Sequence, residues 1–330
     1  MESESNSCGA FASKNINGRD AGCASGVAGP DFASQWAGFR PRGSLARILY
    51  DRQRQDEYLN QIDKNEWYQC DLNSLPPAIA SKFVQLGPDN DTIKFLEESE
   101  KKSDWILTQI WHTIVKAVLG WFMTQTSING WLRRGSMFVL SQPQLLKLLH
   151  ADDEWRADSL LDLGAGDGEV TARLAPLFRN VYVTEVSDTM RSLLDQKGYR
   201  VLDVDAWFLD RKFDFVACLN VIDRCDTPLQ LLSRIRESLK SDGFLLLAVV
   251  LPFSAYVESG APDHKPRELL PIDGERFEDQ VISVVEEVLK PAGFDVTAWS
   301  RVPYLCEGDL HQSYYWLDDV VFVLRLSNAR

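Results

Sequence analysis

A run of apolar residues that ends in a glycine-rich loop constrains this chain more than any other feature. Residues 159–161 lead into Asp162-Leu163-Gly164-Ala165-Gly166-Asp167-Gly168, and a helical pattern follows over residues 170–177. Glycines at such a junction let the backbone turn tightly and approach a ligand closely. Two familiar nucleotide-binding loops do not match. Glu169 stands where a dinucleotide fingerprint has its third glycine, and the Gly-Lys-Ser/Thr of a phosphate-binding loop is absent.

Strand and helix patterns alternate from this loop to the end of the chain. The patterns predict strands over residues 159–166, 180–186, 199–205, 213–220 and 243–251, and helices over 170–177, 189–196, 228–239 and 277–290. Two final strands, over 294–302 and 319–326, follow each other without a helix between them. This alternation indicates a doubly wound α/β sheet, and we expect the last two strands to form an antiparallel pair at its edge.

The residues before position 150 have a different character. Residues 1–35 are rich in Gly, Ser, Ala and Asn without a hydrophobic period, which predicts a disordered tail. Helical patterns over 44–58, 105–122 and 144–150 predict that residues 36–150 form a mostly helical region that packs on the core. An α/β domain is then expected over residues 151–330.

Two acidic residues follow later strands of the predicted sheet. Glu185 ends the second strand, where a carboxylate can accept hydrogen bonds from both hydroxyls of a ribose. Asp205 follows the third strand and is placed to reach an adenine. With Asp162 and the glycine loop, these acids form the pattern of class I methyltransferases. The pattern predicts that Rossmann-like fold and S-adenosylmethionine as cofactor.

Longer strings carry a more specific resemblance, which covers roughly residues 40–328. They read TSINGWLRRGSMFVLS before the loop, LLDLGAGDGEVT at the loop, VTEVSDTM, CLNVIDRCDTPLQLL, LPFSAYVE, RVPYLCEGD and YYWLDDVVFVL. These strings resemble the methyltransferase-like protein 9 (DREV) family. The resemblance implies a protein-histidine methyltransferase that methylates the pros nitrogen of histidine in His-x-His segments, where x is a small residue.

The resemblance also implies which residues face the target imidazole. Asn220 and Asp223 match the family's Asn and Asp, and both lie at the carboxyl end of the predicted fourth strand. Doubly wound sheets bind their ligands at that end. An acceptor that holds the tele N–H of a neutral ring presents the pros lone pair to the methyl group. We therefore expect Asp223 to orient the ring and Asn220 to assist it through a hydrogen bond.

Further residues in the family strings are candidates for ligand contacts. Arg134 and Ser136 precede the loop and are expected to cover the cofactor carboxylate, because Arg suits a carboxylate. Aromatic rings beside acids suit a histidine-rich, partly cationic peptide. The substrate-binding candidates of this kind are Tyr304, Glu307, Asp309 and Tyr314.

Composition excludes some functions. Asp and Glu outnumber Lys and Arg by 48 to 35, a net charge of −13, which argues against binding to nucleic acid. The six cysteines form no Cys-x-x-Cys pair and only four histidines are present, so no metal site is expected. Residues 106–122, the most apolar stretch, are short and polar for a membrane span.

The N-terminal sequence does not read as a signal peptide, which favours a cytoplasmic location. By family resemblance, the endoplasmic reticulum or the mitochondrion stays open. Two other functions also stay open. One is a class I methyltransferase that acts on a small molecule, and the other is a cofactor-binding scaffold without catalysis.

Overall fold

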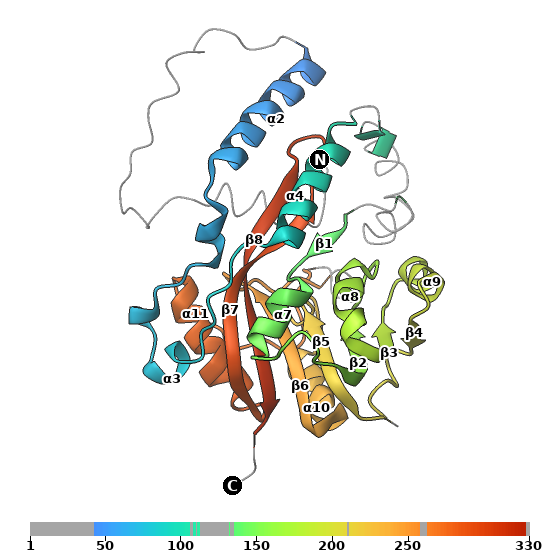
Figure 1. Cartoon of the computed structure of the whole chain (residues 1–330), viewed down its shortest axis with the longest axis vertical. Coiled ribbons are helices and arrows are strands. Elements are labelled where there is room, and N and C mark those ends of the chain that lie inside the picture. The colour runs from blue at the N-terminus through green and yellow to red at the C-terminus, as the bar shows by residue number, and fades with distance from the viewer. Residues whose placement is uncertain are drawn as a thin grey trace.

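A mixed sheet of eight strands is the centre of the part of the chain that the structure describes (Figure 1). This computed structural model describes residues 43–105, 108–109, 111–112, 132, 135–209, 211–257 and 263–327. The tail expected over 1–35 and most of the helix expected over 105–122 lie outside these residues. The strands are β1 (Met137–Phe138), β2 (Ala157–Leu163), β3 (Phe178–Thr184), β4 (Arg200–Leu202), β5 (Phe213–Leu219), β6 (Leu239–Val250), β7 (Phe294–Glu307) and β8 (Tyr314–Leu326).

The strand order is β1-β7-β8-β6-β5-β2-β3-β4. The strands β2 to β6 are parallel to their neighbours among themselves, whereas β8, β7 and β1 each pair antiparallel. This is the class I methyltransferase arrangement predicted from the sequence. The last two strands are antiparallel as expected, but they are not at the edge, because β1 pairs with β7. Two residues are too few for a strand pattern to be recognised in the sequence.

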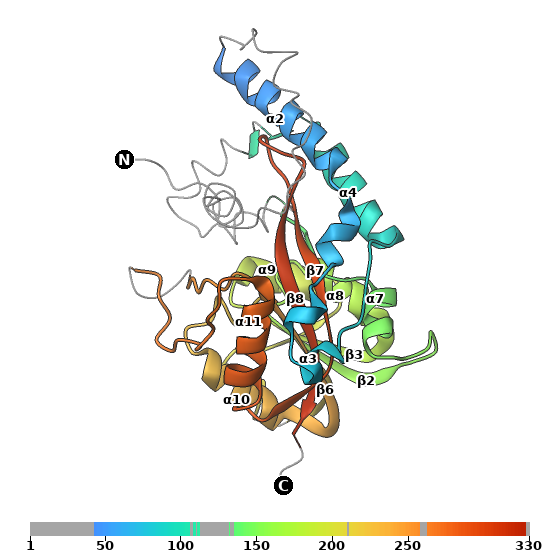
Figure 2. The same cartoon turned by 90° about the vertical axis from the view of Figure 1, so that its left-hand side faces the viewer.

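Helices cover both faces of the sheet, with α10 and α11 on one face and α7 on the other (Figure 2). The α-helices are α2 (Ser44–Gln61), α3 (Pro77–Ala80), α4 (Asn90–Ser103), α7 (Gln142–Leu148), α8 (Glu169–Leu174), α9 (Asp188–Gln196), α10 (Pro228–Ser238) and α11 (Phe277–Ser283). Short 3-10 helices are η2 (Lys64–Tyr68), η3 (Leu72–Ser74) and η4 (Ala175–Leu177), and α11 continues as a π-helix, η5 (Val284–Leu289).

Successive strand residues pack into two different cores, one on each face. Leu161, Val216 and Leu245 belong to the core that includes α10 and α11. Their neighbours Leu160 and Phe215 belong to the core that includes α7. This alternation follows from the period of two in a strand, and burial on both faces explains why the sequence reads as continuous apolar runs. Residues from before position 150 contribute to both cores.

The helix α4 was not predicted from the sequence. Most of its residues are polar, and its only large buried side chains are Phe95 and Leu96, which are too few for a hydrophobic period. Its N-terminus is fixed by Asp89, whose Oδ1 accepts hydrogen bonds from the Thr92 amide at 2.9 Å and hydroxyl at 2.8 Å. The other oxygen of Asp89 accepts from the hydroxyl of Ser141, the cap of α7. One carboxylate thus joins the starts of two helices.

We predict that Asp89→Ala lowers the free energy of unfolding by about 1–2 kcal/mol, the usual cost of losing a cap. The measurement is urea unfolding followed by circular dichroism. Asp91→Ala, an exposed residue in the first turn of the same helix, is the control. Equal losses in the two variants would contradict the capping role.

Candidate functional site

The glycine loop joins β2 to α8 in a left-handed conformation that only glycine adopts easily. Gly164, Gly166 and Gly168 have φ of +66°, +56° and +78°. A Cβ on Gly164 would lie 2.9 Å from Val221 Cγ2, and one on Gly168 would lie 2.8 Å from Leu194 Cδ2. A Cβ on Gly166 would meet nothing within 4 Å. The backbone at Gly166 is therefore bare, as close approach of a ligand requires.

Glu185 lies directly after β3, and its carboxylate faces this loop. It accepts hydrogen bonds from the amides of Gly166 at 3.0 Å, Val186 at 2.8 Å and Ser187 at 2.9 Å. A carboxylate offers about four acceptor positions, so about one further donor, such as a hydroxyl, can still be added. The loop and Glu185 thus combine the two features expected of the S-adenosylmethionine site, bare backbone and a strand-end acceptor.

Asp162 lies in β2, underneath the loop, and is 3% exposed. Burial raises the pKa of Asp162 to about 7, although a hydrogen bond from Thr171 Oγ1 at 2.6 Å opposes the rise. Through this hydrogen bond Asp162 joins β2 to α8, the helix that follows the loop. This burial has a cost in stability at neutral pH, because the charged form is disfavoured.

The other expected cofactor contacts have different placements. Ser136 Oγ lies 3.3 Å from Asp167 Oδ2, which brings it to the edge of the loop. Asp205 is exposed, and its amide donates to Asp203, the residue that directly follows β4. Arg134 lies outside the described residues.

Three polar side chains converge where β5 ends. Asn220 follows β5 with an unusual φ of +56°, and Asp223 is the third residue after it. Asp319 comes from β8 and accepts a hydrogen bond from Asn220 Nδ2 at 2.8 Å. Val221, between Asn220 and Asp223, touches the position of a Gly164 Cβ, so this group adjoins the glycine loop.

This group, which we call the acceptor cluster (Asn220, Asp223 and Asp319), leaves three oxygen atoms without hydrogen bonds. Among the described residues, Asn220 Oδ1, Asp223 Oδ1 and Asp319 Oδ1 are buried and have no partner. Buried oxygens without a donor are costly, and native proteins retain few of them. Because Asp319 is fully enclosed, the two oxygens of Asn220 and Asp223 are the ones that indicate a site for a ligand with N–H or O–H donors.

Burial also raises the pKa values of the two acids in the acceptor cluster. The pKa of Asp223 is raised by burial, while Arg224, whose Nε lies 3.2 Å from Asp223 Oδ2, opposes the rise. The pKa of Asp319 is raised well above its ordinary value by burial and, less strongly, by Asp223. A positively charged ligand would relieve both effects. Sequence reasoning missed Asp319, because its neighbours in the sequence give no sign of what faces it.

The expected substrate-binding residues lie along the β7–β8 hairpin. Glu307 ends β7 and accepts from Lys102 and from the amides of Gly135 and Ser136. Asp309, in the turn, accepts from the Tyr315 hydroxyl at 3.1 Å. Tyr304 is half-buried and contacts the sulfur of Met137, while Tyr314 is buried edge-on against Trp67.

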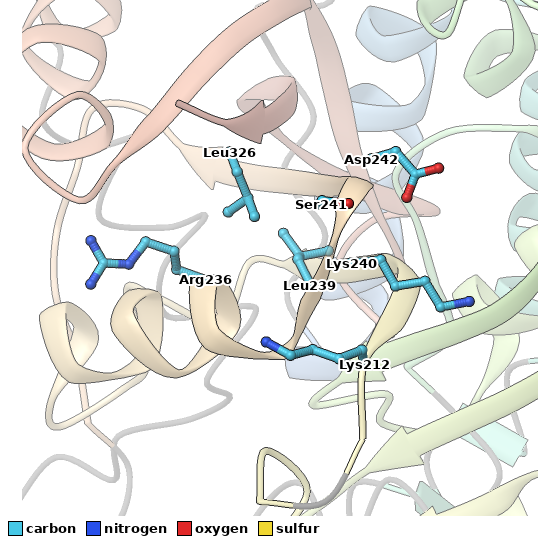
Figure 3. A pocket seen from close by; sticks show the side chains of 7 residues that line it. All are labelled: Lys212, Arg236, Leu239, Lys240, Ser241, Asp242 and Leu326. Carbon is cyan, nitrogen blue, oxygen red and sulfur yellow. The ribbon is translucent and has the colours of Figure 1, made fainter. Parts of the chain in front are cut away.

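A cavity of about 390 Å³ beside the glycine loop brings Ser136, Asp167 and Glu307 together with α4 and α9. A second, shallower hollow of about 470 Å³ lies at the opposite ends of the central strands, where β5 and β6 begin (Figure 3). Doubly wound sheets bind ligands at the carboxyl ends of their strands, so only the first cavity is near the expected chemistry.

Neither a metal site nor a membrane span is seen in the described part of the chain. No three His, Cys, Asp or Glu residues there group as metal ligands, and no helix there is long and apolar enough to cross a membrane. The cysteines Cys70, Cys218, Cys225 and Cys306 are free thiols.

Comparison with known proteins adds to this geometry. The family described as DREV methyltransferase matches residues 67–326. A TehB-like S-adenosylmethionine-dependent methyltransferase from Corynebacterium glutamicum is 15% identical with a TM-score of 0.36, over 57% of this chain and 89% of its own. An S-adenosylmethionine-dependent methyltransferase from Clostridium acetobutylicum is 15% identical with a TM-score of 0.37, over 66% and 98%. The glycopeptide N-methyltransferase MtfA, in complex with S-adenosylmethionine, is 17% identical with a TM-score of 0.37, over 57% and 88%.

We predict that Gly166→Ala weakens S-adenosylmethionine binding tenfold or more, a loss of about 1.4 kcal/mol, because the new methyl group would occupy the bare backbone face. Calorimetric titration measures the affinity. Gly198→Ala is the matched control, since Gly198 also has a positive φ of +82° and open space around a Cβ. Both variants carry the same backbone strain of roughly 1–2 kcal/mol, so equal affinities would remove Gly166 from the site.

A second prediction concerns Asp162 and pH. Between about 4 and 7 the folded protein keeps a proton on Asp162 that the unfolded chain has released, so the free energy of unfolding falls as pH rises. Asp162→Asn removes this dependence. From pH 5 to pH 8 the variant should gain about 2–3 kcal/mol relative to wild type in urea unfolding. Asp158→Asn, on the exposed start of the same strand, should show no such gain.

A difference between Asp162→Asn and wild type that stays constant over this pH range would contradict the raised pKa.

Proposed function

Because this chain belongs to the DREV methyltransferase family, we propose that it methylates the pros nitrogen of histidine in His-x-His segments of proteins. The chain is an S-adenosylmethionine-dependent methyltransferase with the class I fold. What we propose beyond this is the substrate, histidine in proteins, and the atom that is methylated, the pros nitrogen. The single observation that supports them best is the acceptor cluster at the end of β5.

The acceptor cluster suits the N–H of an imidazole. Carboxylate and amide oxygens without donors offer only acceptor positions, and a neutral imidazole carries one N–H and one lone pair. When the tele N–H is held by these oxygens, the pros lone pair remains free on the other side of the ring. The cluster adjoins the glycine loop, so the ring would lie beside the cofactor.

The cofactor S-adenosylmethionine, when bound, supplies a methyl group that is activated by a positively charged sulfur. The chain's own residues then have three tasks. Asp223 and Asn220 orient the ring through its tele N–H. As positive charge develops on the ring, the Asp223 carboxylate offsets it, and such preorganised charge is a large contribution to catalysis. Arg224 holds the other oxygen of Asp223 and opposes the effect of burial on its pKa.

The peptide is proposed to run along the β7–β8 hairpin, where Tyr304, Glu307, Asp309 and Tyr314 were expected to bind it. Asp309 adds negative charge there, which favours a histidine-rich, partly cationic segment, whereas the charge of Glu307 is offset by Lys102. Glu307 also fixes the backbone at Gly135 and Ser136, so it links the peptide side to the loop.

The test of this function is mass spectrometry of a His-x-His peptide incubated with the protein and S-adenosylmethionine. The expected result is a gain of one methyl group, located to the pros nitrogen by comparison with synthetic standards. A peptide with both histidines replaced by glutamine is the control. No gain on histidine, together with methylation of small amines, would favour a small-molecule methyltransferase instead.

We predict that Asp223→Asn lowers the single-turnover rate by on the order of 10²–10³, because the amide has no charge to offset the cation that forms. Peptide affinity should fall less than the rate, since the charge develops mainly in the transition state. S-adenosylmethionine affinity should stay unchanged. Asp226→Asn, three residues further along the same loop, is the control, because Asp226 pairs with Arg267 instead.

Turnover of Asp223→Asn within a few-fold of wild type would exclude Asp223 from the chemistry.

A further inference from the structure

Asp319 lines neither of the two cavities described above, yet it determines which polar atoms of the acceptor cluster face a ligand. The residue is fully buried in β8, where it pairs in register with Val250 of β6 and Val302 of β7. Its Oδ2 accepts from Asn220 Nδ2 at 2.8 Å across the end of β5. A substrate cannot touch a side chain that is fully enclosed, so any role of Asp319 is exerted through Asn220.

The bond from Asn220 to Asp319 decides which end of the Asn220 amide faces the ligand. The Asn220 NH₂ group donates to Asp319 Oδ2 at 2.8 Å, and a carboxylate oxygen that carries no proton can only accept a hydrogen bond. The carbonyl oxygen Oδ1 then points away from Asp319, and it is one of the three oxygens left without a partner among the described residues. The reverse orientation would place a donor in the cluster, and it would repel an imidazole N–H.

The backbone of Asn220 supports the same arrangement. Its φ of +56° is rare for residues other than glycine, and Asn is among the few that tolerate it. The backbone N–H of Asn220 donates to the carbonyl of Ala248 in β6 at 3.1 Å, so hydrogen bonds fix both its backbone and its side chain. Unusual backbone conformations of this kind persist where the surroundings fix them, often at functional sites.

We propose that Asp319 is a positioning residue that fixes the Asn220 amide with its oxygen toward the substrate and so makes the cluster accept, and not donate, hydrogen bonds. One part of this inference rests on the proposed function: that the fixed amide selects the imidazole nitrogen that carries hydrogen. The orientation of the amide itself can be measured without any substrate.

The first experiment measures single-turnover methylation of a His-x-His peptide by Asp319→Asn, Asn220→Ala and the double variant. An amide at 319 can both donate and accept, so it no longer imposes one orientation, and we expect a loss of roughly tenfold, as for a hydrogen bond to a charged group. Because Asp319 acts through Asn220, the double variant should be no slower than Asn220→Ala. A double variant whose fold-loss in rate equals the product of the two single losses would overturn the proposal.

Asp318→Asn is the matched control, because Asp318 is the adjacent acid of the same strand and pairs with Arg301. It should retain wild-type turnover. Asp319→Asn should also retain wild-type affinity for S-adenosylmethionine, which separates positioning from a general loss of structure. Turnover by Asp319→Asn within twofold of wild type would overturn the proposal.

The second experiment uses the ligand-free protein, labelled with ¹⁵N at asparagine. The side-chain amide signal of Asn220 is assigned as the one that Asn220→Ala lacks. In wild type its NH₂ protons should exchange slowly with water, and in Asp319→Leu, which cannot accept, the signal should shift and exchange faster. An unchanged Asn220 signal in Asp319→Leu would overturn the positioning role of Asp319, whether or not the wild type methylates histidine. Failure of the wild type to methylate histidine would by itself refute only the proposed function.

Discussion

The position of β8 between β6 and β7 is the constraint on which the rest of this structure depends. β8 joins the parallel part of the sheet to an antiparallel part that includes β1. Residues from before position 150 therefore share a sheet with β2, the strand that leads into the glycine loop. The same pairing carries Asp319 beneath the end of β5. The fold and the acceptor cluster therefore arise from one set of backbone hydrogen bonds.

Three buried carboxyl groups near the carboxyl ends of the strands lower the stability of the folded protein. Burial raises the pKa values of Asp162, Asp223 and Asp319, which means that each charge costs free energy where it lies. A protein optimised for stability alone would place apolar side chains there. Their presence beside bare glycine backbone is what a binding site for a donor-rich, positively charged group requires, and local costs of this kind are concentrated at functional sites.

Much of this arrangement could be predicted from the sequence, because it depends on local patterns. The apolar strands, the glycine loop and Glu185 are all recognised by neighbours within a few residues. Asp319 and β1 could not be recognised, since the role of each depends on a partner far away in the chain, Asn220 and β7. Glu307 was recognised as an acid in a family string, but its contacts with Lys102, Gly135 and Ser136 depend on tertiary packing.

A site that only accepts hydrogen bonds also treats the product differently from the substrate. On the proposed function, the methylated ring first carries a positive charge and keeps its tele N–H, so Asp223 and Asn220 still hold it. Once that proton is lost to water, the tele nitrogen presents a lone pair to oxygens that have lone pairs of their own. Repulsion replaces attraction, and the neutral product is expelled. Deprotonation would thus act as the release step, and a ring that has been methylated once would not be retained for a second reaction.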